Sequence, residues 1–198
     1  MLMLNTGNHI ELENERALLK PLAKNHANEL LTFAENEPEL WQYSLTSAAG
    51  KEGMKNYISD ALSAKESGTA YPFIVFDKKA NEWCGSTRFY DIQHHHQTVQ
   101  LGYTWYGKKY QGSGINTACK YLMLQFAFET MHCERVELRA DARNARSIAA
   151  MKKIGAIPEG ILRSNCVSID GRRDSIVLGI LKNEWYSTVK SRLEKSFT

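Results

Sequence analysis

The residues best suited to chemistry form a glycine-rich turn that precedes an apolar, helix-like pattern. The turn reads Gln111-Gly112-Ser113-Gly114-Ile115-Asn116. Glycines at these two positions can adopt positive φ angles and let a ligand approach the backbone closely. Successive N–H groups can then converge on an anion, and the following helix adds free N–H groups and the positive end of its dipole. The turn therefore suits a pyrophosphate.

The turn alone does not identify a ligand. It lacks the Gly-Lys-Ser/Thr of a Walker loop and does not fit the longer dinucleotide fingerprint. A tight turn at the start of a helix would look the same. The ligand must therefore be inferred from the residues around the turn.

The hydrophobic pattern predicts the elements that position this turn. Apolar residues at helical spacing predict helices, and short aromatic or β-branched runs predict strands. Asp170-Gly171 is typical of a hairpin, and Gly155 is a suitable helix stop. This order predicts an α+β fold with one domain over residues 1–198, built on a central sheet. Helices are expected at 27–34, 54–62, 115–126, 148–154 and 185–193, an opening strand or hairpin at 9–20, and strands at 71–77, 83–91, 98–106, 135–140, 160–168 and 173–181.

The composition is that of an ordinary globular protein. Of the 198 residues, 43% are hydrophobic and 24% are charged, and the net charge is +3. Basic residues do not cluster as they do in nucleic-acid-binding domains. No apolar run reaches the ~20 residues of a membrane helix, and the N-terminus does not resemble a secretory signal. We expect a cytoplasmic protein with no nucleic-acid or membrane partner.

Neither the cysteines nor the histidines suggest a metal site. The cysteines are scattered, as is typical of a reduced compartment. His94-His95-His96 are adjacent, so their side chains should alternate between faces or lie in solvent. We therefore expect no metal. The four cysteines are Cys84, Cys119, Cys133 and Cys166.

A second motif follows the first, with Asn144 before a short helical pattern that ends at Gly155-Ala156. The two blocks in this order resemble the GNAT superfamily of N-acetyltransferases, whose turn reads Gln/Arg-x-x-Gly-x-Gly/Ala. Asn116 in the last place is a modest departure. The resemblance spans most of the chain and is strongest from 99 to 185. Further residues resemble the ribosomal-protein N-terminal (Rim-type) branch: Leu101-Gly102-Tyr103, Glu159-Gly160, Asp170-Gly171 with Arg173-Asp174, and Glu184-Trp185.

The resemblance implies a mixed, mostly antiparallel sheet that splays between two strands and is flanked by helices, with acetyl-CoA as co-substrate. A backbone N–H near Thr104 would polarise the thioester carbonyl. Asn144 would hydrogen-bond the pantetheine or the reacting region, cap its own helix, or do both. Lys108, Lys109, Lys152 and Lys153 would be solvated, or one or two of them, with Lys152 or Lys153 favoured, would meet the 3′-phosphate. The backbone that would hold the coenzyme comprises Trp105 and Tyr106 along the pantetheine, and Gln111, Gly112, Ser113, Gly114, Ile115 and Asn116 at the pyrophosphate.

The resemblance also implies a proton donor for the leaving thiolate. Many relatives use a Tyr where this chain has Met151, which cannot donate a proton. The Rim-type branch places a Ser at Ser147, either as the acid or simply bonded to its own helix. The general base is not evident, because Gln100 and Cys166 stand where the branch can carry Glu. An α-amine, with a pKa near ~7.7–8.0, needs less help to lose a proton than a lysine near ~10.4.

The sequence therefore predicts an N-acetyltransferase that joins acetyl-CoA and a primary amine in a ternary complex. The amine would be a protein N-terminus or a small molecule. Trp41 and Trp105 are candidates to line its pocket, and the alternative is that they pack in the core. The alternative is a coenzyme A-binding sensor or scaffold that has lost catalysis. Because relatives are often dimers, a homodimer is one option, and the apolar run at 176–180 suits either a core or an interface.

Overall fold

The computed structural model describes residues 4–196 and places their strands in one eight-stranded sheet, in the order β1-β2-β3-β4-β5-β6-β8-β7. Neighbouring strands are antiparallel except β5 and β6, which are parallel. The predicted α+β class and the mixed, mostly antiparallel sheet are confirmed. The strands are β1 (Leu12–Glu13), β2 (Ala17–Pro21), β3 (Ala70–Asp77), β4 (Glu82–Gln93), β5 (Thr98–Tyr106), β6 (Arg135–Asp141), β7 (Ile157–Ser168) and β8 (Gly171–Leu181).

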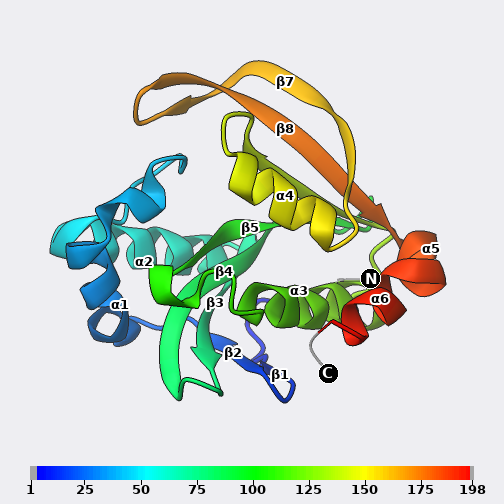
Figure 1. The fold of residues 1–198 in the computed structure, drawn as a ribbon, viewed down its shortest axis with the longest axis horizontal. Helices are drawn as coiled ribbons and strands as arrows, with labels where there is room; N and C mark the ends of the chain where they lie inside the picture. The colour runs from blue at the N-terminus through cyan, green and yellow to red at the C-terminus, as the bar shows by residue number, and fades with distance from the viewer. Residues whose placement is uncertain (1–3, 197–198) are drawn as a thin grey trace.

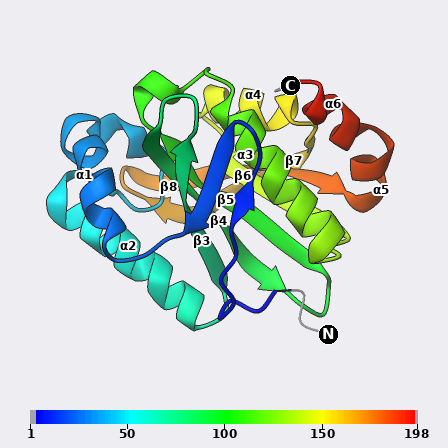
Figure 2. The same ribbon diagram turned by 90° about the horizontal axis from the view of Figure 1, so that it is seen from below.

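The helices lie close to their predicted positions. α3 and α4 lie on either side of β5, and the β7–β8 hairpin arches over α4 (Figure 1). Seen from below, α3 lies across the central strands (Figure 2). The helices are α1 (His26–Asn36), α2 (Gly50–Glu66), α3 (Ile115–Gln125), α4 (Ala145–Lys153), α5 (Lys182–Glu184) and α6 (Lys190–Glu194), with 3-10 turns η1 (Pro38–Trp41) and η2 (Lys108–Tyr110) and π-helical turns η3 (Phe126–Thr130) and η4 (Trp185–Val189).

The strands β5 and β6 begin side by side and then separate. Their pairing runs from Thr98 opposite Arg135 to Leu101 opposite Leu138, although β5 continues to Tyr106. Parallel pairing leaves slanted hydrogen-bonding groups along each strand. The end of the pairing therefore leaves the β6-facing edge of β5 without a strand partner from residue 102 onward. The predicted splay is confirmed.

A β-bulge lies where the strands separate. On the β4 side, Arg88 pairs with Gly102 and Ser86 pairs with Trp105, so β5 has one more residue than β4 in this interval. Tyr103, inside the bulge, has a φ of 49°, which is unusual for a bulky residue. Bulges re-aim the groups of a strand. The bulge and the splay thus change the course of β5 at the same point.

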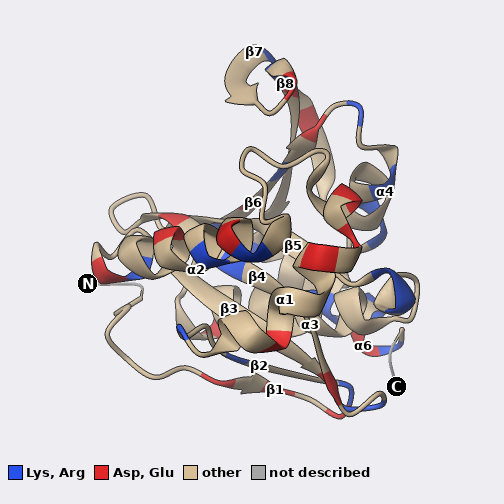
Figure 3. Cartoon of the chain, turned by 90° about the vertical axis from the view of Figure 1, so that its left-hand side faces the viewer, with Lys and Arg blue, Asp and Glu red and all other residues tan. Residues whose placement is uncertain are grey.

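The core fills both faces of the central strands. Ser86 on β4 contacts Tyr57 of α2, whereas the next residue, Thr87, contacts Lys120 of α3. Since consecutive strand residues point to opposite faces, α2 and α3 cover opposite faces of β4. Acidic and basic residues are interspersed over the helices (Figure 3), in keeping with the small net charge.

Candidate functional site

The glycine-rich turn has the backbone conformation that its glycines predict. Gly112 has a φ of 77° and Gly114 a φ of 92°, and Gly114 is the N-cap of α3 without a side-chain cap. A Cβ atom built at either glycine meets no atom within 4 Å. The two glycines are therefore required by backbone conformation, and the space above them is open to a ligand.

Several amides of this turn are free. The N–H groups of Gly112, Gly114, Asn116 and Thr117 have no hydrogen-bond acceptor within residues 4–196. The other amides of the turn are used locally: Ser113 donates to the Tyr110 carbonyl at 3.3 Å, for example. Free N–H groups at a helix start, with the positive end of the dipole behind them, form an anion site.

The first turn of α4 lies against the glycine-rich turn. The Arg146 guanidinium donates to the side-chain oxygen of Gln111, and the Gln111 amide group donates to the Tyr106 carbonyl at 3.0 Å. The structure thus brings together the two motifs, which are far apart in the sequence, and joins both to the end of β5.

Asn144 caps α4. Its side-chain oxygen accepts from the Ser147 N–H at 3.0 Å, so the predicted N-cap role is confirmed. Ser147 is half-buried, and its hydroxyl has no hydrogen-bond partner among the residues that the structure describes. The bond from this hydroxyl to its own helix, which was the alternative for Ser147, is not formed. Lys152 is exposed on the last turn of α4, so its contact with a phosphate stays a prediction.

Thr104 lies in the bulge, and its side chain forms hydrogen bonds with Thr87 and Lys120. Its hydroxyl is 2.7 Å from the Thr87 hydroxyl and accepts from the Lys120 ammonium at 2.8 Å. Trp105 and Tyr106 follow with buried side chains, so only their backbone is available along the open edge of β5. The role of the Thr104 amide stays a prediction.

Lys120 was missed from the sequence. It is 5% exposed, and its ammonium reaches two hydroxyls but no carboxylate within residues 4–196. Burial lowers the pKa of Lys120 to about 8. The available signal was its position within the predicted helix: Cys119 and Tyr121 flank it, and the helix is apolar nearly all round.

Replacing Lys120 with Met should change how stability depends on pH. In the folded protein the lysine loses its proton near pH 8, whereas in the unfolded chain it does so near ~10.4. Between these values the unfolded state binds more protons, so wild-type stability should rise with pH by up to ~1.4 kcal/mol per pH unit relative to Lys120→Met. Urea unfolding of both proteins from pH 7 to 10 measures this difference. Parallel curves would show that Lys120 does not titrate in this window.

Arg88 is a second missed residue, on the opposite face of β4 from Lys120. Its guanidinium carbon lies 4.0 Å from the ring centre of Tyr103 and 5.0 Å from that of Tyr57. The Tyr57 hydroxyl lies 3.2 Å from the Ser86 hydroxyl and 3.4 Å from the Tyr103 carbonyl oxygen, and either oxygen can accept its one proton. Arg88 is therefore held beside the bulge by two aromatic rings. A single arginine in a predicted strand gave no signal of this role.

The two candidate pocket tryptophans are buried. Trp41 and Trp105 pack edge to face with ring centres 5.2 Å apart, and Trp105 also packs against Phe33 and Tyr57. Both side chains belong to the aromatic part of the core between η1, α2 and β5. Neither indole ring is exposed to an open pocket, so the prediction that they line one is wrong. Their indole N–H groups have no acceptor among the residues described.

Gln100 and Cys166, which stand where the Rim-type branch can carry a Glu as general base, make other contacts. Gln100 is buried and donates to the Asp91 carboxylate at 2.7 Å. Cys166 is half-buried, with its sulfur 3.7 Å from the Ser175 hydroxyl. Burial raises the pKa of the nearby Tyr90 hydroxyl far above its usual value, so Tyr90 is not available as a base.

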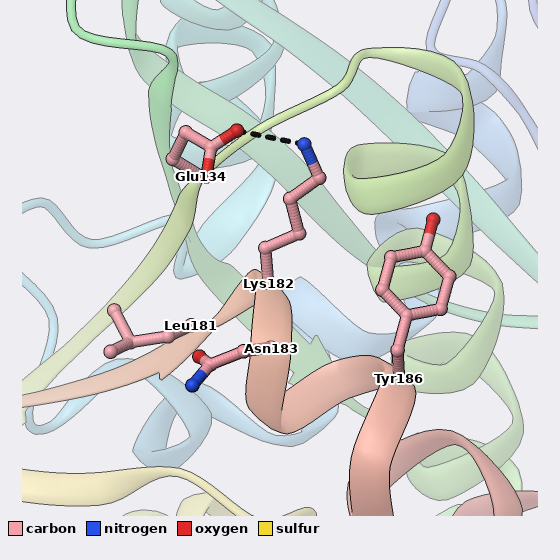
Figure 4. Close-up of a pocket in the computed structure, with 5 residues that line it drawn as sticks. All are labelled: Glu134, Leu181, Lys182, Asn183 and Tyr186. Atoms are coloured by element: carbon pink, nitrogen blue, oxygen red, sulfur yellow. Dashed lines mark hydrogen bonds and ion pairs between the residues drawn. The ribbon is translucent and has the colours of Figure 1, made fainter.

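A hollow of about 560 Å³ lies next to the glycine-rich turn, with Lys109 and Tyr110 in its wall. Another, of about 350 Å³, lies away from the turn at the end of β8 (Figure 4), where Lys182 pairs with Glu134 at 2.7 Å. Because that pair satisfies its own charges, the hollow offers no free group to a charged ligand. Its walls are Glu134, Leu181, Lys182, Asn183 and Tyr186. Within residues 4–196, no three His, Cys, Asp or Glu side chains gather as metal ligands, and no helix is long and apolar enough to cross a membrane.

The family model and the similar curated proteins agree on one family. Residues 16–157 match the model of the acetyltransferase (GNAT) domain. The chain is 30% identical over 176 residues to "Probable N-acetyltransferase YjcK" of Bacillus subtilis (strain 168), which covers 86% of this chain and 96% of that protein. It is 29% identical over 102 residues to "Putative ribosomal N-acetyltransferase YdaF" of the same organism, over 52% of this chain and 55% of that protein.

A solved structure shares the fold. Mycobacterium smegmatis RimJ, in complex with CoA-disulfide, superposes with a TM-score of 0.79 over 95% of this chain and 93% of that chain. At 19% identity this likeness shows the fold alone. The resemblance to the GNAT superfamily, predicted from the two motifs, is confirmed, and a relative named as a putative ribosomal N-acetyltransferase is among the similar proteins.

Proposed function

Because the chain belongs to the GNAT acetyltransferase family, we propose that it transfers the acetyl group of acetyl-CoA to a primary amine by direct attack within a ternary complex. The observation that carries this proposal is the set of free amides at Gly112, Gly114, Asn116 and Thr117, next to the open edge of β5. The anion site suits the pyrophosphate of coenzyme A. The adjacent open strand edge suits the pantetheine arm, which contains amide groups.

The coenzyme fits these groups in a definite order. The free amides donate hydrogen bonds to the pyrophosphate, and the positive end of the α3 dipole stabilises its charge. The edge of β5 from Gly102 to Tyr106 pairs with the pantetheine arm as a missing strand would. Lys152, exposed on α4, is our candidate for the 3′-phosphate. The thioester then lies at the bulge, where the Thr104 N–H polarises its carbonyl.

The proposed reaction forms one bond and breaks one. The neutral amine attacks the thioester carbonyl carbon, the new C–N bond forms, and the C–S bond breaks. The amine loses one proton to water or a carboxylate, and the departing thiolate gains one from the Ser147 hydroxyl, which takes a proton back from water. Ser147 suits this role because it is half-buried, because its hydroxyl has no other partner within residues 4–196, and because α4 lies against the coenzyme turn.

The acceptor in this proposal is an α-amine. One relative is named as a ribosomal N-acetyltransferase, which favours a protein N-terminus, and a small amine is the alternative. Gln100 provides no carboxylate at the position where the branch can have one. An α-amine with a pKa near ~7.7–8.0 is already partly neutral at physiological pH and does not require a strong base.

Thiol release tests the function directly. Purified protein and acetyl-CoA should release free coenzyme A when peptides with free N-termini are added, and the acetyl group should appear on the peptide by mass spectrometry. Matched peptides with a blocked N-terminus are the control. Binding of acetyl-CoA without thiol release for any amine would favour the second candidate function, a coenzyme A-binding sensor or scaffold. The observation behind this candidate is Met151, which stands where many relatives have a proton-donating Tyr.

A further inference from the structure

Arg88 is a buried charge that no side chain within the described residues neutralises. The Arg88 residue is 5% exposed, and its Nε–H group is buried without a hydrogen-bond acceptor among the residues described. No carboxylate lies within ion-pair distance of it, and its guanidinium makes no hydrogen bond, within residues 4–196. A desolvated charge without a partner is unfavourable by several kcal/mol in general, on the order of the cost of leaving an ion unpaired. A ligand that brings a negative charge to the guanidinium would remove this cost.

Several other arginines of the fold have carboxylate partners. Arg16 contacts Asp77, Arg135 contacts Glu159 and Glu137, and Arg143 contacts Asp141 and Asp170. Arg173, 8% exposed, also has no carboxylate partner within residues 4–196, but its guanidinium donates to the Ser175 hydroxyl and to the Tyr43 carbonyl. Arg88 differs from these arginines because it is buried and its guanidinium makes no hydrogen bond within the same residues.

The surroundings of Arg88 hold its orientation without cancelling its charge. Tyr57 and Tyr103 face the guanidinium with their rings, which stabilises a cation but leaves its N–H groups free. The Tyr103 ring also packs edge-on against Tyr90 at 5.1 Å. The adjoining aromatic part of the core contributes donors rather than acceptors, since the indole N–H groups of Trp41 and Trp105 are also without partners in the described chain. The site thus favours an acceptor group with negative charge.

The position of Arg88 connects this site to the reaction. Arg88 pairs with Gly102, the last β5 residue before the bulge, and Tyr103 of the bulge covers its guanidinium. In the proposed function the thioester lies at this bulge. A group bound by Arg88 would therefore be held close to the amine that attacks the thioester, on the α2 face of the sheet.

We propose that Arg88 binds a carboxylate of the acceptor, so that the substrate is an amine with a carboxylate a few bonds away. This inference rests on the proposed acetyl transfer. A bidentate arginine–carboxylate pair fixes both distance and orientation, and binding the acceptor in one pose is what a direct attack requires. The carboxylate has two sources, the acidic side chain of a peptide N-terminus or a free amino acid.

Matched acceptors and matched variants test this. Thiol release is measured for peptides beginning with Asp against the same peptides beginning with Asn, and for glycine against glycinamide. The variants are Arg88→Gln, Arg88→Lys and, as a control for net charge, Arg163→Gln at an exposed β7 position. Acetyl-CoA affinity and melting temperature are measured for each.

Wild-type protein should prefer the carboxylate member of at least one pair by roughly 10- to 100-fold in kcat/KM, as expected for a charge-assisted hydrogen-bonded pair. Arg88→Gln should lose this preference, Arg88→Lys should retain part of it, and Arg163→Gln should keep it. All variants should bind acetyl-CoA as wild type does. The pair that shows the preference identifies the source of the carboxylate.

Two results overturn the inference, and they are distinct. Acetylation of neutral acceptors with no carboxylate preference, or a preference that survives in Arg88→Gln, refutes the role of Arg88 and leaves acetyl transfer intact. Absence of thiol release with every acceptor refutes the proposed function itself, and the inference falls with it.

Discussion

Gly114→Val should abolish acetyl-CoA binding while the protein still folds. Gly114 has a φ of 92°, and a Cβ at this position meets no protein atom within 4 Å. The valine side chain would instead fill the space assigned to the pyrophosphate and displace it from the free amides. Loss of these charge-assisted bonds should weaken binding roughly 100-fold or more, whereas the strain of a left-handed valine costs the fold only about 1–2 kcal/mol.

Gly68→Val is the matched control. Gly68 lies between α2 and β3 with a φ of 76°, and its Cβ would also meet nothing within 4 Å. The two variants thus carry the same kind of backbone strain, but only one adds a side chain at the turn. Calorimetric titration of both should show binding lost in Gly114→Val and kept in Gly68→Val. Normal binding by Gly114→Val would show that the phosphates lie elsewhere.

Ser147→Ala should slow the chemical step by on the order of 100-fold, the low end of what a positioned general acid contributes. Acetyl-CoA affinity should hardly change, because Ser147 contributes its backbone N–H to the Asn144 cap and alanine keeps that bond. Single-turnover thiol release measures the step separately from binding.

The control for Ser147 is a serine with no assigned role. Ser63 is exposed in the interior of α2, so Ser63→Ala removes a hydroxyl from a helix at a distance from the coenzyme turn. It should leave both rate and affinity unchanged. A rate for Ser147→Ala equal to that of Ser63→Ala would remove Ser147 as the proton donor and direct attention to water as the acid.

Local backbone chemistry explains why much of the fold could be predicted. Gly114 and Gly155 mark a helix start and a helix end by their conformational freedom, and the structure gives both a positive φ. Asp170-Gly171 marks the β7–β8 hairpin in the same way. These signals depend on a few neighbouring residues, which a sequence displays directly.

The site was harder to predict where tertiary contacts determine it. Lys120 and Arg88 are charged residues in segments that periodicity identifies correctly, but their burial depends on Thr87, Thr104 and Tyr57 from other elements. The bulge at Tyr103 follows from the register of β4 against β5. The apolar run at 176–180 could suit core or interface, and the structure buries Leu178 and Ile180 fully.

The central claim is that the free amides of the glycine-rich turn and the open edge of β5 form the acetyl-CoA site. Titration calorimetry of the wild-type protein with acetyl-CoA, alongside ATP and NAD at the same concentrations, tests it most directly. We predict saturable one-to-one binding of acetyl-CoA and none of the two nucleotides. Absence of acetyl-CoA binding, or equal binding of ATP, would contradict the account.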